Sequence, residues 1–178
     1  MNLTVNIRQE RPDDHQWVVE LTERAFETMP YSDGKEGRLV HNLRKSQFFI
    51  PELSLVAEYE SRVVGHILFT PVIIDNGSQK FHSLLLGPVS VLPELQNQGI
   101  GSQLIKAGHQ RAKDLGHHSV ILVGHAEYYP RFGYKSCSTW NIKSTLALPS
   151  DDVFMAVELS EGALQGVNGT LILPPEFE

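Results

Sequence analysis

Apolar positions recur along the chain with two periods, and each period predicts one kind of element. Residues 3–8 alternate apolar and polar side chains, as a half-buried strand does. After Pro12, which suits the first turn of a helix, apolar side chains follow at helical spacing up to Pro30. They are Val18, Leu21, Ala25 and Met29. A second helix is predicted over residues 34–46, with Leu39, Val40 and Leu43 facing inward.

The middle of the chain predicts strands and one long helix. Residues 53–59 and 62–74 are rich in β-branched and aromatic side chains and are separated by two polar residues, which predicts a hairpin. Asp75-Asn76-Gly77 is a turn signal before another strand at 81–91. Residues 100–115 predict the clearest helix, ended by Gly116. Its inward positions are Ile100, Leu104, Ile105, Gly108, Ala112 and Leu115.

The last third predicts shorter elements. A buried strand at 119–124 is followed by a short helical segment, a strand near 134–143 and a strand at 153–159. Residues 3–159 are therefore expected to form a single domain. Residues 160–178 are expected to be a C-terminal extension whose segment 170–173 adds an edge strand. The strands at 81–91 and 119–124 flank one helix, so this βαβ unit predicts that they are parallel.

Composition narrows the class of protein. The chain has 178 residues, 41% of them hydrophobic and 20% charged, which is ordinary for a globular domain. Its net charge of −6 and lack of a basic run argue against nucleic-acid binding. No stretch approaches the roughly 20 apolar residues of a membrane span, and the N-terminal segment lacks an apolar signal core. We expect a cytoplasmic protein.

Cysteine and histidine usage argue against a metal site. The single cysteine, Cys137, has no partner for a disulfide and is expected to be a partly buried thiol. The eight histidines show neither HxxxH nor HxH spacing. His66, inside a predicted strand, is expected to be a hydrogen-bonded core or groove histidine.

The segment before the long helix predicts an anion site. The strand ends at Val91, Pro93 turns the chain, and Gln96-x-x-Gly99-x-Gly101 opens the helix, with Ser102 as a further hydroxyl donor. First-turn amides of a helix have no internal partners and carry roughly half an elementary positive charge. Two glycines let the backbone approach a phosphate closely. The alternative is a plain glycine-rich turn, and the strand–turn–helix context favours the anion site.

This segment resembles motif A of the GNAT (Gcn5-related) N-acetyltransferases. The resemblance rests on the stretch from Val89 to Leu104, which contains the Q/R-x-x-G-x-G/A core. It continues through residues 124–134, Gly-His-Ala-Glu-Tyr-Tyr-Pro-Arg-Phe-Gly-Tyr, which is similar to the family's motif B. Together with Leu86-Gly-Pro-Val-Ser-Val91, this segment resembles the YhbS-like branch. The element order matches over residues 3–159.

The resemblance implies a fold and a cosubstrate. The fold is an α/β, mostly antiparallel mixed sheet, flanked by helices, with a central parallel strand pair that splays apart. Backbone groups of Val89 and Val91 would bind the pantetheine arm of acetyl-CoA as an added strand does. The pyrophosphate would contact a set of amides, those of Gln96, Gln98, Gly99, Gly101 and Ser102. No metal is implied.

The resemblance also implies a general acid. Tyr129 stands four residues before Gly133 and matches the tyrosine that protonates the departing CoA thiolate, although the adjacent Tyr128 leaves the register open. The base is open because Leu84–Leu86 occupy the region where some members place a glutamate. The candidates are His125, Glu127, Glu27 and His82, with a water chain or an already neutral amine as equal alternatives.

The implied function is transfer of an acetyl group from acetyl-CoA to a primary amine by direct attack in a ternary complex. The acceptor is a small-molecule or peptide amine, and its identity is not readable from the sequence. Homodimers are common in the family, so a homodimer is an open expectation. The alternatives are a non-catalytic acyl-CoA-binding or regulatory module on the same fold, and an ATP-binding protein, which the missing GxxxxGK[ST] disfavours.

Overall fold

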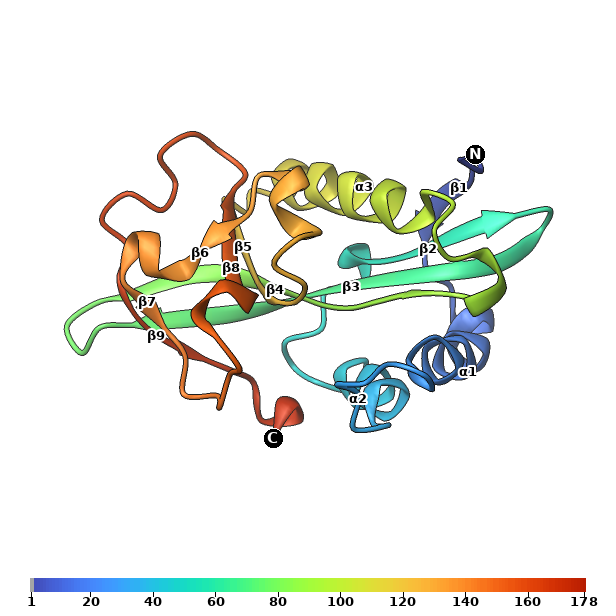
Figure 1. The fold of residues 1–178 in the computed structure, drawn as a ribbon, viewed down its shortest axis with the longest axis horizontal. Helices are drawn as coiled ribbons and strands as arrows, with labels where there is room; N and C mark the ends of the chain where they lie inside the picture. The colour runs from blue at the N-terminus through green and yellow to red at the C-terminus, as the bar shows by residue number, and fades with distance from the viewer. Residues whose placement is uncertain (1) are drawn as a thin grey trace. The chain divides into compact units, whose positions relative to one another are not determined.

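The computed structural model describes residues 2–178. Within these residues, nine strands form one mixed sheet in the order β1-β2-β3-β4-β5-β8-β6, and β9 pairs with β3 and β7 (Figure 1). The strands are β1 (Asn6–Gln9), β2 (Ser54–Tyr59), β3 (Arg62–Asp75), β4 (Lys80–Val91), β5 (Ser119–Val123), β6 (Lys135–Ser136), β7 (Ile142–Lys143), β8 (Phe154–Glu158) and β9 (Gly169–Ile172). The α-helices are α1 (His15–Phe26), α2 (Glu36–Leu43) and α3 (Ile100–Asp114).

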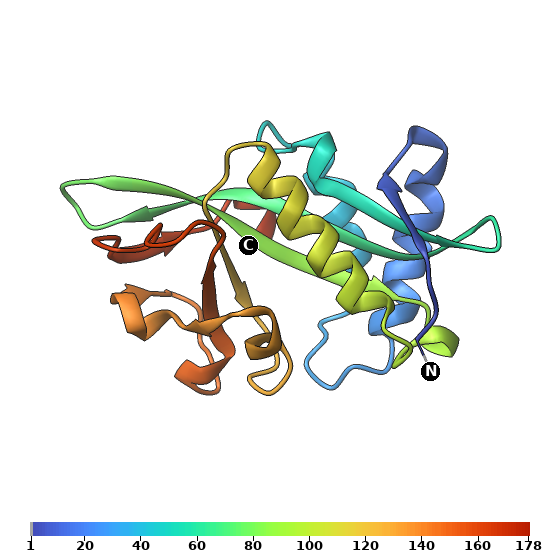
Figure 2. The same cartoon turned by 90° about the horizontal axis from the view of Figure 1, so that it is seen from above.

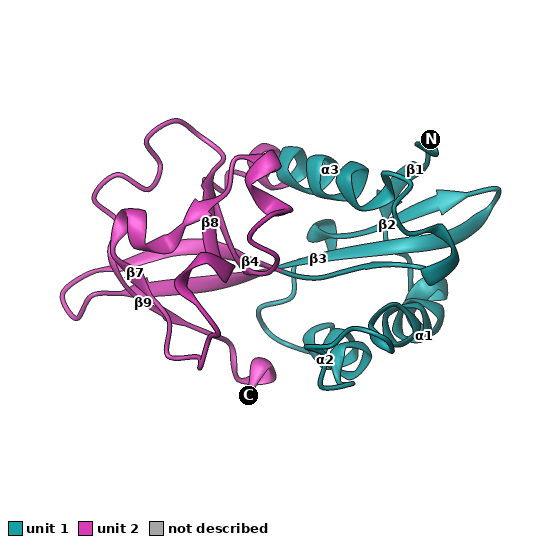
Figure 3. Cartoon of the chain, in the orientation of Figure 1, with its two compact units in different colours: residues 1–69, 87–111 teal, residues 70–86, 112–178 magenta. Residues whose placement is uncertain are grey.

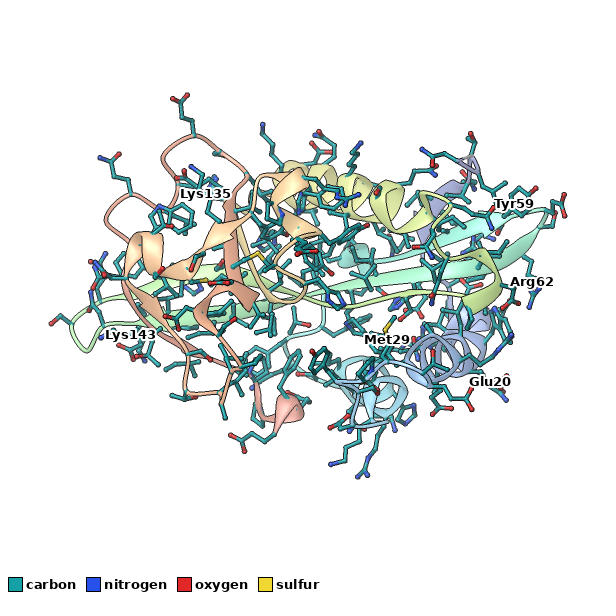
Figure 4. The ribbon with its side chains drawn as sticks, viewed as in Figure 1. Glu20, Met29, Tyr59, Arg62, Lys135 and Lys143 are labelled. Atoms are coloured by element: carbon teal, nitrogen blue, oxygen red, sulfur yellow. The ribbon has the colours of Figure 1, made fainter. Side chains whose placement is uncertain are left out.

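The predicted parallel pair is confirmed. Leu84 and Leu85 of β4 lie opposite Val120 and Ile121 of β5 in parallel register, and α3 connects the two strands. The predicted hairpin is also confirmed, since β2 and β3 pair antiparallel up to Tyr59 and Arg62 at its tip (Figure 4). A mixed sheet with the central parallel pair β4–β5 and flanking helices is the fold class that the sequence predicted, and β7 and β9 form a second parallel pair.

The chain forms two compact units, and β3, β4 and α3 each contribute residues to both (Figure 3). Unit 1 comprises residues 1–69 and 87–111, and unit 2 comprises residues 70–86 and 112–178. In unit 1, α1 and α2 cover one face of the strands and α3 covers the other (Figures 1 and 3). Its buried side chains include Val18, Leu21, Val40, Leu43, Leu55, Ile67 and Leu104.

Unit 2 has its own apolar core. Strand β8 pairs with β5 and β6, while β9 pairs with β3 and β7, so the tail strand is bordered by a strand on either side. The core side chains are Val72, Ile74, Leu85, Ile121, Cys137, Ile142, Phe154, Ala156, Leu164 and Leu171. A pair of buried hydroxyls, Ser83 and Ser119 at 2.7 Å, joins β4 to the start of β5.

Several predicted boundaries are wrong. Helix α1 ends at Phe26, so Met29 lies in the α1–α2 connection and is 38% exposed (Figure 4). Helix α2 is shorter than the predicted 34–46, and Leu115, just beyond α3, is 44% exposed. The strand predicted near 134–143 is divided into β6 and β7 by a 3₁₀ turn. Asn141 ends that turn in the left-handed region, where asparagine is tolerated and a strand cannot continue.

The predicted first strand begins late, at Asn6 rather than at Leu3. The residues before it still have alternating side chains, but their backbone groups bond to the start of α3 instead of to a strand. Leu3 N donates to the carbonyl oxygen of Gln98 at 2.9 Å, and Val5 N donates to Oε1 of Gln103 at 3.2 Å. Local alternation therefore predicted the extended conformation but not its partner.

Candidate active site

The loop before α3 presents unpaired backbone donors, all in unit 1. A 3₁₀ turn at Pro93–Leu95 leads into Asn97 and Gly99, whose φ angles are +62° and +80°. Helix α3 then begins at Ile100. Within residues 2–178, the backbone N–H groups of Gln98, Gly99, Ile100 and Gly101 donate no hydrogen bond. A helix start of this kind, preceded by left-handed residues, suits an anion because amides and dipole act in the same direction.

Gln96 differs from the other predicted donors. Its amide donates to the carbonyl oxygen of Pro93 at 3.4 Å, closing the turn before the loop. Its side-chain Nε2 donates to the carbonyl oxygen of Val91 at 3.1 Å. Gln96 thus ties the loop back to the end of β4. Of the predicted donor set, Gly99 and Gly101 retain free amides, Gln98 does as well, and Ser102 lies partly buried in the first turn of α3.

The end of β4 places Val89 and Val91 on one edge of the strand. Leu92 N donates to the carbonyl oxygen of Val64 in β3 at 2.9 Å. The Ser90 carbonyl oxygen also faces β3, since a Cβ on Gly65 would lie 3.1 Å from it. Backbone groups of alternate residues in a strand point to the same edge, so those of Val89 and Val91 point away from β3. This edge is available for strand-like binding of an extended ligand.

In unit 2, Tyr129 is held in an aromatic cluster after β5. Its ring centroid lies 5.1 Å from that of Tyr128 and 5.7 Å from that of Tyr134, both edge-on. Gly124 lies directly beneath the ring, because a Cβ there would approach Tyr129 Cε2 to 2.4 Å. The amides of Tyr128 and Tyr129 both donate to the carbonyl oxygen of His125, which sets the entry into the 3₁₀ turn Tyr129–Phe132. This role of Gly124 depends on a contact with Tyr129 and carries no signal in the sequence pattern.

The Tyr129 hydroxyl is chemically available. Within residues 2–178 it forms no hydrogen bond, although the ring is largely buried. Burial, assisted by Tyr128, raises the pKa of Tyr129 to about 12. The phenol is therefore protonated throughout the neutral range and can donate to a ligand. Tyr128 differs, since its ring lies under the Arg131 guanidinium at 4.5 Å.

None of the candidate bases is held in a buried position. His125 and Glu127 are exposed on the loop between β5 and the Tyr129 turn, and Glu27 and His82 are also exposed. Leu84, Leu85 and Leu86 are buried, so this part of β4 offers no carboxylate. Cys137 is 1% exposed, and burial raises the pKa of its thiol to about 12, which disfavours a thiolate nucleophile.

The described residues contain neither a metal-binding cluster nor a helix able to span a membrane. Across residues 2–178, no group of three or more His, Cys, Asp or Glu side chains is placed to hold a metal ion. Every helix in the same range is too short or too polar to span a bilayer.

Comparison with known proteins decides the family. The model of the acetyltransferase (GNAT) domain matches residues 6–137, which is most of the chain. The chain belongs to the GNAT acetyltransferase family. In this GNAT protein the loop that resembles motif A lies at the start of α3, and Tyr129 lies after β5.

Three relatives extend this assignment. The uncharacterised N-acetyltransferase YjhQ of Escherichia coli K12 is 38% identical over 115 residues, which are 65% of this chain and 64% of YjhQ, so the match spans just under two thirds of that relative. A GNAT family acetyltransferase from Brucella melitensis, solved with acetyl-CoA, is 34% identical with a TM-score of 0.80, covering 98% of this chain and 99% of that one. YhbS from Escherichia coli, solved with CoA, is 28% identical with a TM-score of 0.85, covering 99% and 93%. The last match agrees with the predicted YhbS-like branch.

Proposed function

We propose that this GNAT protein transfers an acetyl group from acetyl-CoA to a primary amine, with residues 3–159 as the catalytic domain. The observation that carries the proposal is the set of unpaired amides at the start of α3, which forms a phosphate site without a lysine. The relatives from Brucella melitensis and Escherichia coli, solved with acetyl-CoA and CoA, support it because they cover nearly the whole chain.

Binding is assigned to backbone groups of unit 1. The amides of Gln98, Gly99 and Gly101 donate to the diphosphate oxygens, with Ser102 as an added donor. The amide of Gln96 joins them only if its long 3.4 Å bond to Pro93 gives way. The outward-facing backbone groups of Val89 and Val91 hydrogen-bond the pantetheine arm as a neighbouring strand would. These contacts hold the thioester before the acceptor arrives.

The chemical step is direct transfer. The amine nitrogen attacks the thioester carbonyl carbon, a C–N bond forms, the C–S bond breaks, and the electron pair leaves on sulfur as a thiolate. Holding both reactants together supplies much of the rate. The proton lost by the amine goes to His125, Glu127, Glu27, His82 or solvent, and the structure favours none of them.

Tyr129 is assigned to the leaving group. Its hydroxyl donates to the thiolate sulfur as the C–S bond breaks, which offsets the developing charge. A pKa of about 12 lies above the reference value of about 8.5 for a thiol, so hydrogen bonding to sulfur is its first contribution. Complete proton transfer then requires that the bound thiolate be more basic than a thiolate in water.

The test is Tyr129→Phe, with Tyr128→Phe as the matched control. We expect thiol release from acetyl-CoA, measured across a panel of amines, to fall roughly 10- to 1000-fold, near the usual value of general acid catalysis. CoA binding by isothermal titration should be unchanged, and Tyr128→Phe should keep most of the rate. An undiminished rate in Tyr129→Phe would remove it from this role.

The same assay separates catalysis from binding alone. The absence of a buried carboxylate among Leu84–Leu86 is the observation that favours a non-catalytic acyl-CoA-binding module. That module would bind CoA but release no thiol with any amine. The acceptor, a cytoplasmic location and a homodimer stay predictions, and a co-purified amine seen beside bound CoA would identify the acceptor.

A further inference from the structure

The N-terminal segment Asn2–Val5 is joined to the phosphate loop by the side chain of Gln103 and by a backbone bond from Leu3. Figure 2 shows this segment running along the start of α3. Nε2 of Gln103 donates to the carbonyl oxygen of Leu3 at 2.6 Å, and Oε1 accepts from Val5 N at 3.2 Å. The side-chain amide of Gln103 therefore makes the two hydrogen bonds with this segment that the backbone of a neighbouring strand would otherwise make.

Gln103 also holds the loop itself. Its Nε2 and its backbone N both lie 3.2 Å from the carbonyl oxygen of Gly99 and donate to it. The preceding carbonyl, that of Gln98, accepts from Leu3 N at 2.9 Å. Two successive carbonyl groups of the loop are thus bonded to the clamp, which we define as Gln103 together with Asn2–Val5.

Peptide planarity transmits this restraint to the anion-binding amides. In a trans peptide the C=O and N–H of one unit point in opposite directions. The Gln98 carbonyl belongs to the same peptide unit as the Gly99 amide, and the Gly99 carbonyl to the same unit as the Ile100 amide. Bonding both carbonyls to the clamp turns both amides away from it, and neither amide donates a hydrogen bond within residues 2–178.

Asn2 adds a steric restraint. A Cβ on Gly99 would lie 2.9 Å from both Cγ and Oδ1 of Asn2. The clamp therefore contacts Gly99 where a side chain would stand, and the φ of +80° is a conformation that glycine adopts without strain.

We propose that Gln103 and Asn2–Val5 position the Gly99 and Ile100 amides for the diphosphate of the acyl-CoA substrate. The inference rests on the proposed function and adds to it a positioning residue that touches no substrate. The loop is ordered before the ligand arrives, so less of the binding energy is lost in ordering it.

The experiment compares CoA with pantetheine, which lacks the diphosphate. Gln103→Met keeps the length of the side chain and its helix propensity but removes its hydrogen bonds. We expect Gln103→Met to weaken CoA binding roughly 10-fold, the size of one to two net hydrogen bonds, and to leave pantetheine affinity within about twofold. CoA is titrated calorimetrically and pantetheine as its competitor. The control is Gln16→Met on α1, since among the described residues the Gln16 side chain bonds only Glu20, and the variant should leave both affinities unchanged.

A second variant tests the clamp independently, in case Gln103→Met disturbs folding. Leu3→Pro removes the N–H that holds the Gln98 carbonyl but leaves Gln103 intact. It should weaken CoA binding by a smaller factor, and its combination with Gln103→Met should cost less than the product of the two effects because both act on one loop.

The contrary outcomes are distinct. Equal losses of CoA and pantetheine affinity, or no loss in either variant, would overturn the clamp while a wild-type preference for CoA leaves the phosphate site intact. If the wild type binds CoA no more tightly than pantetheine, the proposed phosphate site itself is wrong, and the clamp falls with it.

Discussion

The start of α3 and the segment around Tyr129 hold their proposed functional groups by different means. At the start of α3 the functional groups are backbone amides, and hydrogen bonds from Gln103 and Leu3 orient them. Around Tyr129 the functional group is one hydroxyl, and ring packing on Gly124 and Tyr134 orients it. The backbone amides at the start of α3 tolerate changes of side chain as long as the backbone conformation is kept. The segment around Tyr129 requires the tyrosine side chain itself and a glycine at position 124 in contact with its ring.

The two units that contain these regions also differ in their buried polar groups. Unit 1 contains a buried polar network in which Arg44 and Ser54 donate to Glu10, and Ser54 Oγ lies 2.8 Å from His66 Nε2. The Tyr129 cluster of unit 2 is aromatic. His66 is fully buried, and Nδ1 of its ring has no hydrogen-bond partner within the described residues. A buried charge network is more sensitive to pH than an aromatic cluster. Three predictions test this difference and the difference in how the two regions are held.

The largest expected effect is acid destabilisation through His66. Burial is the main cause that lowers the pKa of His66, to about 4 from an ordinary 6.5, so between these values the unfolded state binds a proton that the folded state does not. Stability is thus unaffected above pH 6.5 and falls as the pH drops to about 4, by about 3 kcal/mol. Denaturant unfolding at a series of pH values measures it.

The control for this prediction is His66→Gln, which cannot titrate. Its stability should depend less steeply on pH between about 4 and 6.5. Some slope should remain, because burial also lowers the pKa of His109 to about 4. Burial alone would raise the pKa of Glu10, but hydrogen bonds from Arg44 and Ser54 and nearby positive charge hold it below its ordinary value, so its contribution is lost only in stronger acid. Identical slopes for the two proteins would contradict the assignment to His66.

The next effect is on rate, at Gly124. Gly124→Ala places a methyl carbon 2.4 Å from Tyr129 Cε2, so the ring must move. A displacement of about 1 Å at a reacting group costs on the order of 100-fold, and we expect that loss in the acyl-transfer rate with CoA affinity unchanged. Gly166→Ala, in the same unit and facing open space, should cost stability through its positive φ but leave the rate intact. A normal rate in Gly124→Ala would show that packing does not position Tyr129.

The smallest effect is on CoA binding, at Gly99. Gly99→Ala strains a residue at φ +80° and brings its Cβ to 2.9 Å from Asn2. We expect CoA affinity to fall roughly 10-fold, because strain of this kind costs on the order of 1–3 kcal/mol and part of it is relieved by displacing the loop. Gly116→Ala, at φ +87° with open space around it, is the matched control and should bind CoA normally. Adding Asn2→Gly should restore part of the affinity if contact with Asn2 contributes, and a normal affinity in Gly99→Ala alone would argue against the loop as the phosphate site.

Prediction from the sequence succeeded where a pattern is local and long. The apolar spacing of α3, from Ile100 to Ala112, and the turn signal between β3 and β4 each lie within one segment. Gln96, Gly99 and Gly101 marked the loop for the same reason. Prediction failed at short elements such as β6 and β7, where a single left-handed residue, Asn141, ends the strand pattern.

The sequence by itself determined the order of the long elements, the parallel β4–β5 pair and the motifs for which we propose phosphate and thiolate chemistry. Tertiary structure alone decided which groups support them. Gln103 bonds Leu3 across 100 residues of sequence, and Glu10 bonds Ser54 across 44. Such contacts depend on which strands and helices meet in the folded chain, and no periodicity within one segment encodes a partner in another.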